Sequence, residues 1–151
     1  MGEADLEAVV CLEKEAQTSP WNAEMFRQEL RNPLAHIDLL WCAGRLAGYL
    51  CSLFVAGELH ILNVVTSPEM RRRGVAYALV RHVLQRSLRQ GLEAAFLEVR
   101  YGNQAAIALY EEFGFRPGAV RRNYYSDGED ALLMKLEPPF AAGLTAKKDS
   151  G

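Results

Sequence analysis

The spacing of apolar residues along this 151-residue chain predicts four amphipathic helices. Apolar side chains recur three and four positions apart, which is the period of a helix with one buried face. Asn22 and Asn103 stand where helix N-caps are expected, and Gly91 and Gly114 stand where helices end. The four expected helices cover residues 6–16, 23–30, 75–90 and 104–113.

Short runs rich in β-branched and aromatic residues predict six strands between these helices. Gly44-Arg45 and Gly57-Glu58 supply turns between the first three strands, which are therefore expected to form consecutive antiparallel hairpins. The two later helices then act as crossovers, which makes the sheet mixed. The sequence thus predicts an α+β fold, with strands at residues 36–43, 46–55, 59–65, 94–100, 115–125 and 131–136 and a turn at residues 126–128 between the last two.

Length and composition indicate one globular domain. Half of the residues are hydrophobic and 24% are charged, which is ordinary globular usage, and 151 residues suffice for one core. From Pro138 onward the chain is small, polar and lysine-bearing. We therefore expect one domain over residues 1–137 and a disordered tail over residues 138–151.

Charge and cysteine content narrow the function further. A net charge of -2 argues against bulk nucleic-acid binding, although the arginines are clustered, which favours a local anionic ligand. The three cysteines have no metal-site spacing and the three histidines lie in separate elements. No signal peptide or membrane-length apolar run is visible. We expect a cytoplasmic protein that binds no metal, no nucleic acid and no membrane.

A basic loop with one glycine, residues 71–76, joins a predicted buried strand to the longest helix. Backbone amides at a helix start, the positive end of the helix dipole and nearby arginines together suit a pyrophosphate. An ordinary solvated loop is the alternative. Arginines at a helix start oppose the dipole, however, and so need a reason.

Glu98 and Tyr110 are the candidate chemical groups in the second half of the chain. Glu98 stands in a strand with the apolar pattern of an interior strand, where a carboxylate is costly unless it is paired. It is either a general base whose pKa is raised by partial burial, or a residue that is ion-paired with Arg100 or exposed at an edge. Tyr110 lies on the apolar stripe of its helix, so it is either a residue of the hydrophobic core or a functional residue. Residues 121–125 are polar and aromatic, as in a solvated rim or a substrate-gripping loop.

These segments together resemble the GCN5-related N-acetyltransferases. The pattern Arg71-x-x-Gly74-x-Ala76 after a strand looks like the acyl-CoA pyrophosphate loop of that superfamily. Members begin with a strand before the first helix, and that strand is missing here; Ala76 also stands where many members have glycine. The chain is similar in particular to RimI-type ribosomal-protein alanine N-α-acetyltransferases, at residues 20–21, 97–100, 103–110, 114–115, 121–125 and 127–131.

The resemblance implies transfer of the acetyl group of acetyl-CoA to a protein N-terminal amine, by direct attack of the amine on the thioester and without a metal. The implied acceptor is the N-terminal alanine of a small-subunit ribosomal protein. Lysine side chains, polyamines and other small-molecule amines remain alternative acceptors, and a non-catalytic acyl-CoA-binding module is a further alternative.

The resemblance also assigns roles to particular residues. It puts the base on Glu98, the acid on Tyr110 and acceptor contacts on Tyr124 and Tyr125. The implied acetyl-CoA contacts are Val64, Val65, Thr66, Arg72, Arg73, Gly74, Val75, Ala76, Tyr77 and Asn103.

Overall fold

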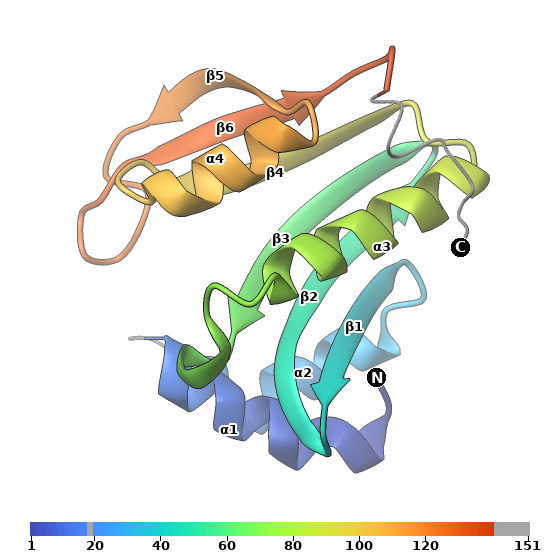
Figure 1. Cartoon of the computed structure of the whole chain (residues 1–151), viewed down its shortest axis with the longest axis vertical. Coiled ribbons are helices and arrows are strands. Elements are labelled where there is room, and N and C mark those ends of the chain that lie inside the picture. The colour runs from blue at the N-terminus through green and yellow to red at the C-terminus, as the bar shows by residue number, and fades with distance from the viewer. Residues whose placement is uncertain (18–19, 141–151) are drawn as a thin grey trace. The chain divides into compact units, whose positions relative to one another are not determined.

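A computed structural model describes residues 1–17 and 20–140 of the chain. It contains a six-stranded mixed sheet in the order β1-β2-β3-β4-β6-β5, flanked by helices (Figure 1). Short 3-10 turns occupy Glu3–Asp5 and Pro68–Met70. The other elements, in chain order, are α1 (Leu6–Ala16), α2 (Ala23–Arg31), β1 (Ala35–Cys42), β2 (Arg45–Val55), β3 (Glu58–Thr66), α3 (Val75–Arg89), β4 (Ala94–Arg100), α4 (Gln104–Glu112), β5 (Arg116–Arg121) and β6 (Ala131–Leu136).

The predicted order of elements and the mixed pairing are confirmed. Ala43, Gly44, Ala56 and Gly57 all have positive φ values, which is the geometry of two-residue hairpin turns. β1 is antiparallel to β2, and β4 is parallel to β3 after the crossover through α3. β6 is antiparallel to both β4 and β5, so α4 crosses over between β4 and β5. Among residues 1–17 no strand precedes α1, so the chain departs from the family pattern there as its sequence predicted.

The prediction of a strand over residues 115–125 is wrong beyond Arg121, where β5 ends. Residues 122–130 form a loop that bonds to itself: the Tyr125 amide donates to the Glu129 carbonyl oxygen at 3.1 Å. The Gly128 amide likewise donates to the Tyr125 carbonyl oxygen at 2.8 Å. Because these backbone groups are satisfied locally, they do not join the sheet. The division at residue 137 stays a prediction, and residues 141–151 of the expected tail lie outside the described residues.

The chain divides into two compact units, and the first consists of Met1–Phe54 and Leu62–Val83. Its core lies where α1 and α2 cover one face of β1 and β2. The Phe26 ring meets the Trp21 ring at 5.3 Å and the Tyr49 ring at 5.8 Å between centroids. Aromatic pairs at these separations add to the burial of apolar surface, so they fix α2 on the strands.

Gly48, on β2, allows the first turn of α3 to lie close to this strand. A Cβ atom at Gly48 would lie 2.6 Å from the Val65 carbonyl oxygen and 2.7 Å from Val75 Cγ1. Real Cβ atoms do not approach so closely. Glycine at this position therefore allows the end of β3 and the first turn of α3 to pack against β2.

A buried carboxylate, Glu13, links α1 to the sheet within the first unit. Glu13 is 2% exposed and accepts hydrogen bonds from the Tyr49 hydroxyl and, at 3.0 Å, from the Trp21 amide. The Tyr49 hydroxyl in turn accepts from Asn63 Nδ2 at 3.4 Å. Buried polar groups need such partners. This chain of bonds fixes Asn63, the residue directly before Val64 on β3.

The second unit consists of Val55–Ile61 and Leu84–Gly151. Side chains on β4 alternate: Ala95, Leu97 and Val99 are buried, and Glu98 faces the other side of the strand. The Tyr110 ring of α4 is buried against the Phe115 ring, with 5.8 Å between the centroids. The second unit therefore has one packed face of β4 and one face that carries polar groups.

Buried thiol and hydroxyl groups predict a loss of stability at alkaline pH. Burial raises the pKa of the Cys51 thiol to about 12 and that of Tyr110 to about 12. Burial, together with the hydrogen bond to Glu13, also raises the pKa of Tyr49. The unfolded chain loses these protons first, since the ordinary values are 9.0 for the thiol and 10.0 for tyrosine. At pH values below these unfolded-state pKa values the free energy of unfolding therefore has its full value. Above them it falls, by up to about 1.36 kcal/mol per pH unit for each group.

Urea unfolding at roughly pH 8, 9.5 and 10.5 measures this loss. Cys51→Ala should flatten the earliest part of the fall, because the thiol titrates first. Cys11→Ala is the matched control, since Cys11 is exposed. A free energy of unfolding that stays constant across this range contradicts the prediction.

Candidate active site

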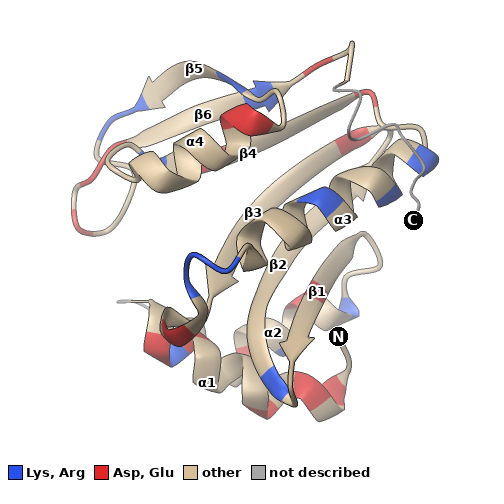
Figure 2. Cartoon of the chain, viewed as in Figure 1, with Lys and Arg blue, Asp and Glu red and all other residues tan. Residues whose placement is uncertain are grey.

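The segment between β3 and α3 has a backbone suited to binding an anion. Arg72 and Gly74 adopt left-handed φ values of 67° and 77°, which turn successive amides toward one side. The Ala78 amide donates to the Gly74 carbonyl oxygen at 2.9 Å, so the Val75 amide precedes the hydrogen-bond ladder of α3. The first turn of α3 has no acidic residue, and residues 71–73 are exposed (Figure 2, blue). The predicted basic turn at a helix start is confirmed, and its ligand stays a prediction.

The end of β3 offers backbone groups next to this loop. The parallel register of β3 with β4 covers Glu58–Ile61, so residues 64–66 lie beyond its end. Val65 is buried in the core, and the Ser67 amide donates to the Ala47 carbonyl oxygen at 2.8 Å, which fixes the exit of the strand. The backbone amides and carbonyls of residues 64–66 are therefore not paired with β4.

Glu98 lies on the polar face of β4 and has two partners from the segment after β5. Its Oε1 accepts a hydrogen bond from the Tyr124 hydroxyl at 2.7 Å, and its Oε2 lies 3.5 Å from Arg121 Nε. Glu98 alternates to the face of β4 opposite Leu97, and its side chain is 33% exposed, so the carboxylate is partly buried as expected. Its role as a base stays a prediction. The ion-pair partner is Arg121 instead of Arg100. The carboxylate is thus both accessible and held in one orientation.

Tyr110 is 7% exposed and packs at the edge of Phe115. Burial raises its pKa to about 12, and the electrostatic effect of Tyr125 adds to the rise. At neutral pH the hydroxyl therefore keeps its proton and can donate it. This geometry suits a packed core tyrosine, and it equally suits a donor to a developing negative charge.

Asn103 is the N-cap of α4, as the sequence predicted. Its Oδ1 accepts from the Ala106 amide at 3.1 Å, which satisfies one of the unpaired amides at the helix start. The cap uses only the oxygen of the side chain. A contact between Asn103 and acetyl-CoA stays a prediction.

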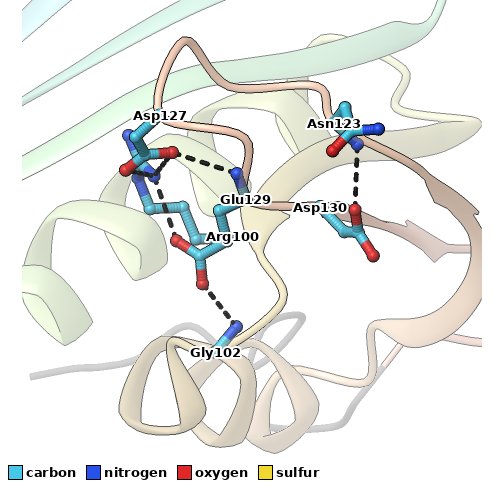
Figure 3. Close-up of polar contacts among 6 residues, drawn as sticks. All are labelled: Arg100, Gly102, Asn123, Asp127, Glu129 and Asp130. Atoms are coloured by element: carbon cyan, nitrogen blue, oxygen red, sulfur yellow. Dashed lines mark hydrogen bonds and ion pairs between the residues drawn. The ribbon is translucent and has the colours of Figure 1, made fainter.

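Arg100 links the end of β4 to the loop of residues 122–130 (Figure 3). Its Nη1 lies 2.9 Å from Asp127 Oδ2 and 3.0 Å from Glu129 Oε1. Glu129 Oε2 also accepts from the Gly102 amide at 3.0 Å, and the guanidinium carbon lies 4.1 Å from the centroid of the Tyr125 ring. Sequence reasoning missed this network. An arginine two residues after Glu98 on the same face, with acids in a later turn, is the signal that could have indicated it.

The structure brings the candidate residues together within each unit. The first unit holds residues 64–66 and the loop of residues 71–74 with the start of α3. The second unit holds Glu98, Asn103 and Tyr110 together with the two loop tyrosines. Tyr124 contacts Glu98, and the Tyr124 and Tyr125 rings meet at 5.1 Å in a T-shaped pair. Tyr77, on the first turn of α3, is partly exposed.

The described residues also bear on metal binding and on membrane spanning. No group of three or more His, Cys, Asp or Glu side chains that could hold a metal ion occurs within residues 1–17 and 20–140. In the same part of the chain, every helix is too short or too polar to cross a membrane.

Comparison with known proteins agrees with the fold. Residues 6–115 match the Acetyltransferase (GNAT) family. The [ribosomal protein bS18]-alanine N-acetyltransferase of Escherichia coli is 35% identical over 135 residues, which are 87% of this chain and 90% of that protein. The N-alpha-acetyltransferase RimI of Mycobacterium tuberculosis is 35% identical over 139 residues, 84% of each chain.

A solved structure is also similar across nearly the whole chain. The crystal structure of the ribosomal-protein-S18-alanine N-acetyltransferase from Escherichia coli matches with a TM-score of 0.85 and 32% identity, covering 98% of this chain and 96% of that one. Fold and sequence together define an N-acetyltransferase. The chain belongs to the Acetyltransferase (GNAT) family, whose acyl donor is acetyl-CoA.

Proposed function

We propose that this enzyme acetylates the N-terminal α-amine of a protein, and that its acceptor is the N-terminal alanine of ribosomal protein bS18. The observation that carries the acceptor is the 35% identity, over 90% of its length, to the Escherichia coli enzyme named for that reaction. The loop that holds Tyr124 against Glu98 supports a polypeptide acceptor, because its side chains are polar and exposed beside a carboxylate.

Acetyl-CoA binds mainly to backbone groups of the first unit. The pantetheine amides pair with residues 64–66 as an added strand would. The amides at the start of α3 and the side chains of Arg72 and Arg73 hold the pyrophosphate. Asn103 is a further proposed contact with acetyl-CoA. The donor-binding set is therefore Val64, Val65, Thr66, Arg72, Arg73, Gly74, Val75, Ala76, Tyr77 and Asn103.

The reaction needs a neutral amine, a base and a donor to the leaving thiolate. An α-amine has an ordinary pKa near 7.8 and a lysine one near 10.4, so deprotonating the α-amine costs about 3.5 kcal/mol less. The amine nitrogen attacks the thioester carbonyl carbon, the carbon–sulfur bond breaks, and Glu98 takes the amine proton. The Tyr110 hydroxyl donates a hydrogen bond to the sulfur of the departing CoA thiolate.

The test is acetyl-CoA turnover with peptides that begin with Ala, Ser or Met, with N-terminally blocked peptides that contain lysine, and with spermidine. We expect the highest kcat/KM for the Ala peptide, with mass spectrometry placing the acetyl group on its α-amine. A preference for blocked lysine peptides or spermidine overturns the proposed acceptor. Absence of turnover with all of these acceptors overturns the proposed N-terminal activity.

The loop at the start of α3 gives a prediction for acetyl-CoA affinity. Gly74→Asp places a carboxylate where the pyrophosphate is expected and blocks its close approach to the backbone. We expect the affinity for acetyl-CoA, measured by calorimetry, to fall tenfold or more, which corresponds to about 1.4 kcal/mol. The matched control is Gly44→Asp, since Gly44 has a similar φ of 81° and, like Gly74, open space around its Cα. Unchanged affinity in folded Gly74→Asp removes the loop from the donor site.

A further inference from the structure

The loop of residues 122–130 is held to β4 mainly by one guanidinium. Arg100 binds a carboxylate oxygen of Asp127 at 2.9 Å and one of Glu129 at 3.0 Å, and it stacks on the Tyr125 ring. The Glu129 amide and Arg100 both bond to Asp127, and together they hold the pKa of that carboxyl below its ordinary value. Both carboxylates bond to one nitrogen of the guanidinium, Nη1. Arginine suits this role because its planar group can stack on an aromatic ring while its nitrogen bonds to carboxylates.

The same strand carries Glu98 and Arg100 on one face, two residues apart. The loop contacts them in the same order: Tyr124 donates to Glu98 at 2.7 Å, and Tyr125 packs on Arg100. Tyr124 is 46% exposed, and its ring packs on that of Tyr125, with 5.1 Å between the centroids. The position of its hydroxyl beside Glu98 therefore depends on how firmly the rest of the loop is attached at Arg100.

The loop is ordered further by bonds within itself. Asp130 Oδ1 accepts from the Asn123 amide at 2.9 Å, and Asp127 Oδ1 accepts from the Glu129 amide at 3.0 Å (Figure 3). These bonds give the loop a defined shape, but they join it only to itself. The loop is attached to β4 and the residues after it by the bonds of Arg100, by the bond between Glu129 and the Gly102 amide, and by the bond of Tyr124 to Glu98. The Tyr101 amide also donates to the Asp130 carbonyl oxygen at 2.9 Å, which fixes the last residue of the loop.

We propose that Arg100 is a positioning residue that attaches the loop of residues 122–130 to β4, so that Tyr124 and Tyr125 receive a polypeptide acceptor beside Glu98. This inference rests on the proposed function for its acceptor. A peptide acceptor can bind to the loop with its backbone amides and carbonyls, and to Glu98 with its terminal amine. A small amine has no such groups and depends on Glu98 alone. Arg100 therefore favours polypeptides over small amines without touching either one.

The kinetic test compares Arg100→Lys with Arg116→Lys, the same substitution at an exposed position on β5. Lysine keeps the charge but lacks the planar group that stacks on the Tyr125 ring. We expect KM for the Ala peptide to rise about tenfold or more in Arg100→Lys, with KM for acetyl-CoA within about twofold of wild type. KM for alaninamide, which lacks the rest of the peptide, should change much less. Equal losses for the peptide, alaninamide and acetyl-CoA show a general structural role and overturn the proposal.

Hydrogen exchange tests the attachment independently of activity. In Arg100→Lys, the amides of Tyr125 and Gly128 should exchange about tenfold faster or more, while amides of β4 and β6 keep their protection. Glu129→Gln should have a similar effect, and the double variant should add little, because both changes remove the same contact. Unchanged exchange in the loop overturns the proposal even if the enzyme is active. Faster loop exchange in an enzyme that does not acetylate peptides retains the attachment and rejects the proposed acceptor.

Discussion

Glu98→Gln should lower kcat by about 100-fold or more while the affinity for acetyl-CoA stays near that of wild type. Glutamine has the shape of glutamate and can still accept the hydrogen bond of the Tyr124 hydroxyl, now 2.7 Å from Glu98 Oε1. It cannot take a proton from the attacking amine. The substitution therefore separates the basicity of Glu98 from its contact with the loop.

Steady-state turnover of the Ala peptide measures this effect. Glu58→Gln is the matched control, because Glu58 is an exposed strand carboxylate that also has a side-chain partner, His60 Nε2, at 3.3 Å. We expect near wild-type turnover in the control. If Glu98→Gln also keeps near wild-type kcat, the carboxylate only anchors Tyr124 and Arg121, and another group is the base.

The sequence could predict the fold well because each element has a local signal. Helical spacing, the caps Asn22 and Asn103, and the glycines at turns all depend on neighbouring residues, and the structure has each of them where it was expected. The basic turn before α3 is local in the same sense. Gly74 has a left-handed φ of 77° that other residues rarely adopt, so its place in the motif is readable without the fold.

The surroundings of Glu98 could not be predicted in this way. Phe96 lies on the same face of β4 as Glu98, so the strand has apolar residues on both faces and looks interior throughout. Whether a strand face is covered depends on what packs over it, which no local pattern contains. The structure covers the face of Leu97 and leaves that of Glu98 open.

The ion-pair partners of Arg100 and Arg121 could not be predicted from the sequence either. Arg100 is the near neighbour of Glu98, yet its bonds go to Asp127, 27 residues away, and Arg121 takes the position beside Glu98. Several pairings satisfy the same charges, and the shape of the loop selects one. The strand expected over residues 122–125 obscured that shape, because a strand would have directed alternate side chains to opposite faces.

These differences separate the two halves of the proposed site. The proposed donor half depends on backbone amides and on a short loop in which Arg72 and Gly74 have left-handed φ values, so a short motif describes it. The acceptor half depends on side chains brought together from β4 and a distant loop. We therefore expect changes in the loop of residues 122–130 to alter the choice of acceptor while leaving the binding of acetyl-CoA nearly unchanged.

Tyr110→Phe is expected to lower kcat by about 100-fold while changing the free energy of unfolding by only about 1 kcal/mol. The ring and its packing on Phe115 remain, so the fold loses no more than the hydroxyl. Burial raises the pKa of Tyr110 to about 12, whereas the ordinary pKa of a thiol is 9.0. Complete transfer of the proton to a free thiolate is therefore uphill by about 4 kcal/mol. Tyr110 then acts by donating a hydrogen bond as negative charge develops on sulfur.

This mechanism gives Tyr110 a signature in the pH–rate profile as well as in kcat. Because its pKa is about 12, the wild-type kcat should show no basic limb from this hydroxyl below about pH 10. Tyr101→Phe is the control, since it removes the same hydroxyl from a tyrosine that is 51% exposed, and it should leave kcat and the melting temperature unchanged. A Tyr110→Phe enzyme with near wild-type kcat and a lowered melting temperature contradicts the donor role, because those are the properties of a tyrosine that only packs in the core.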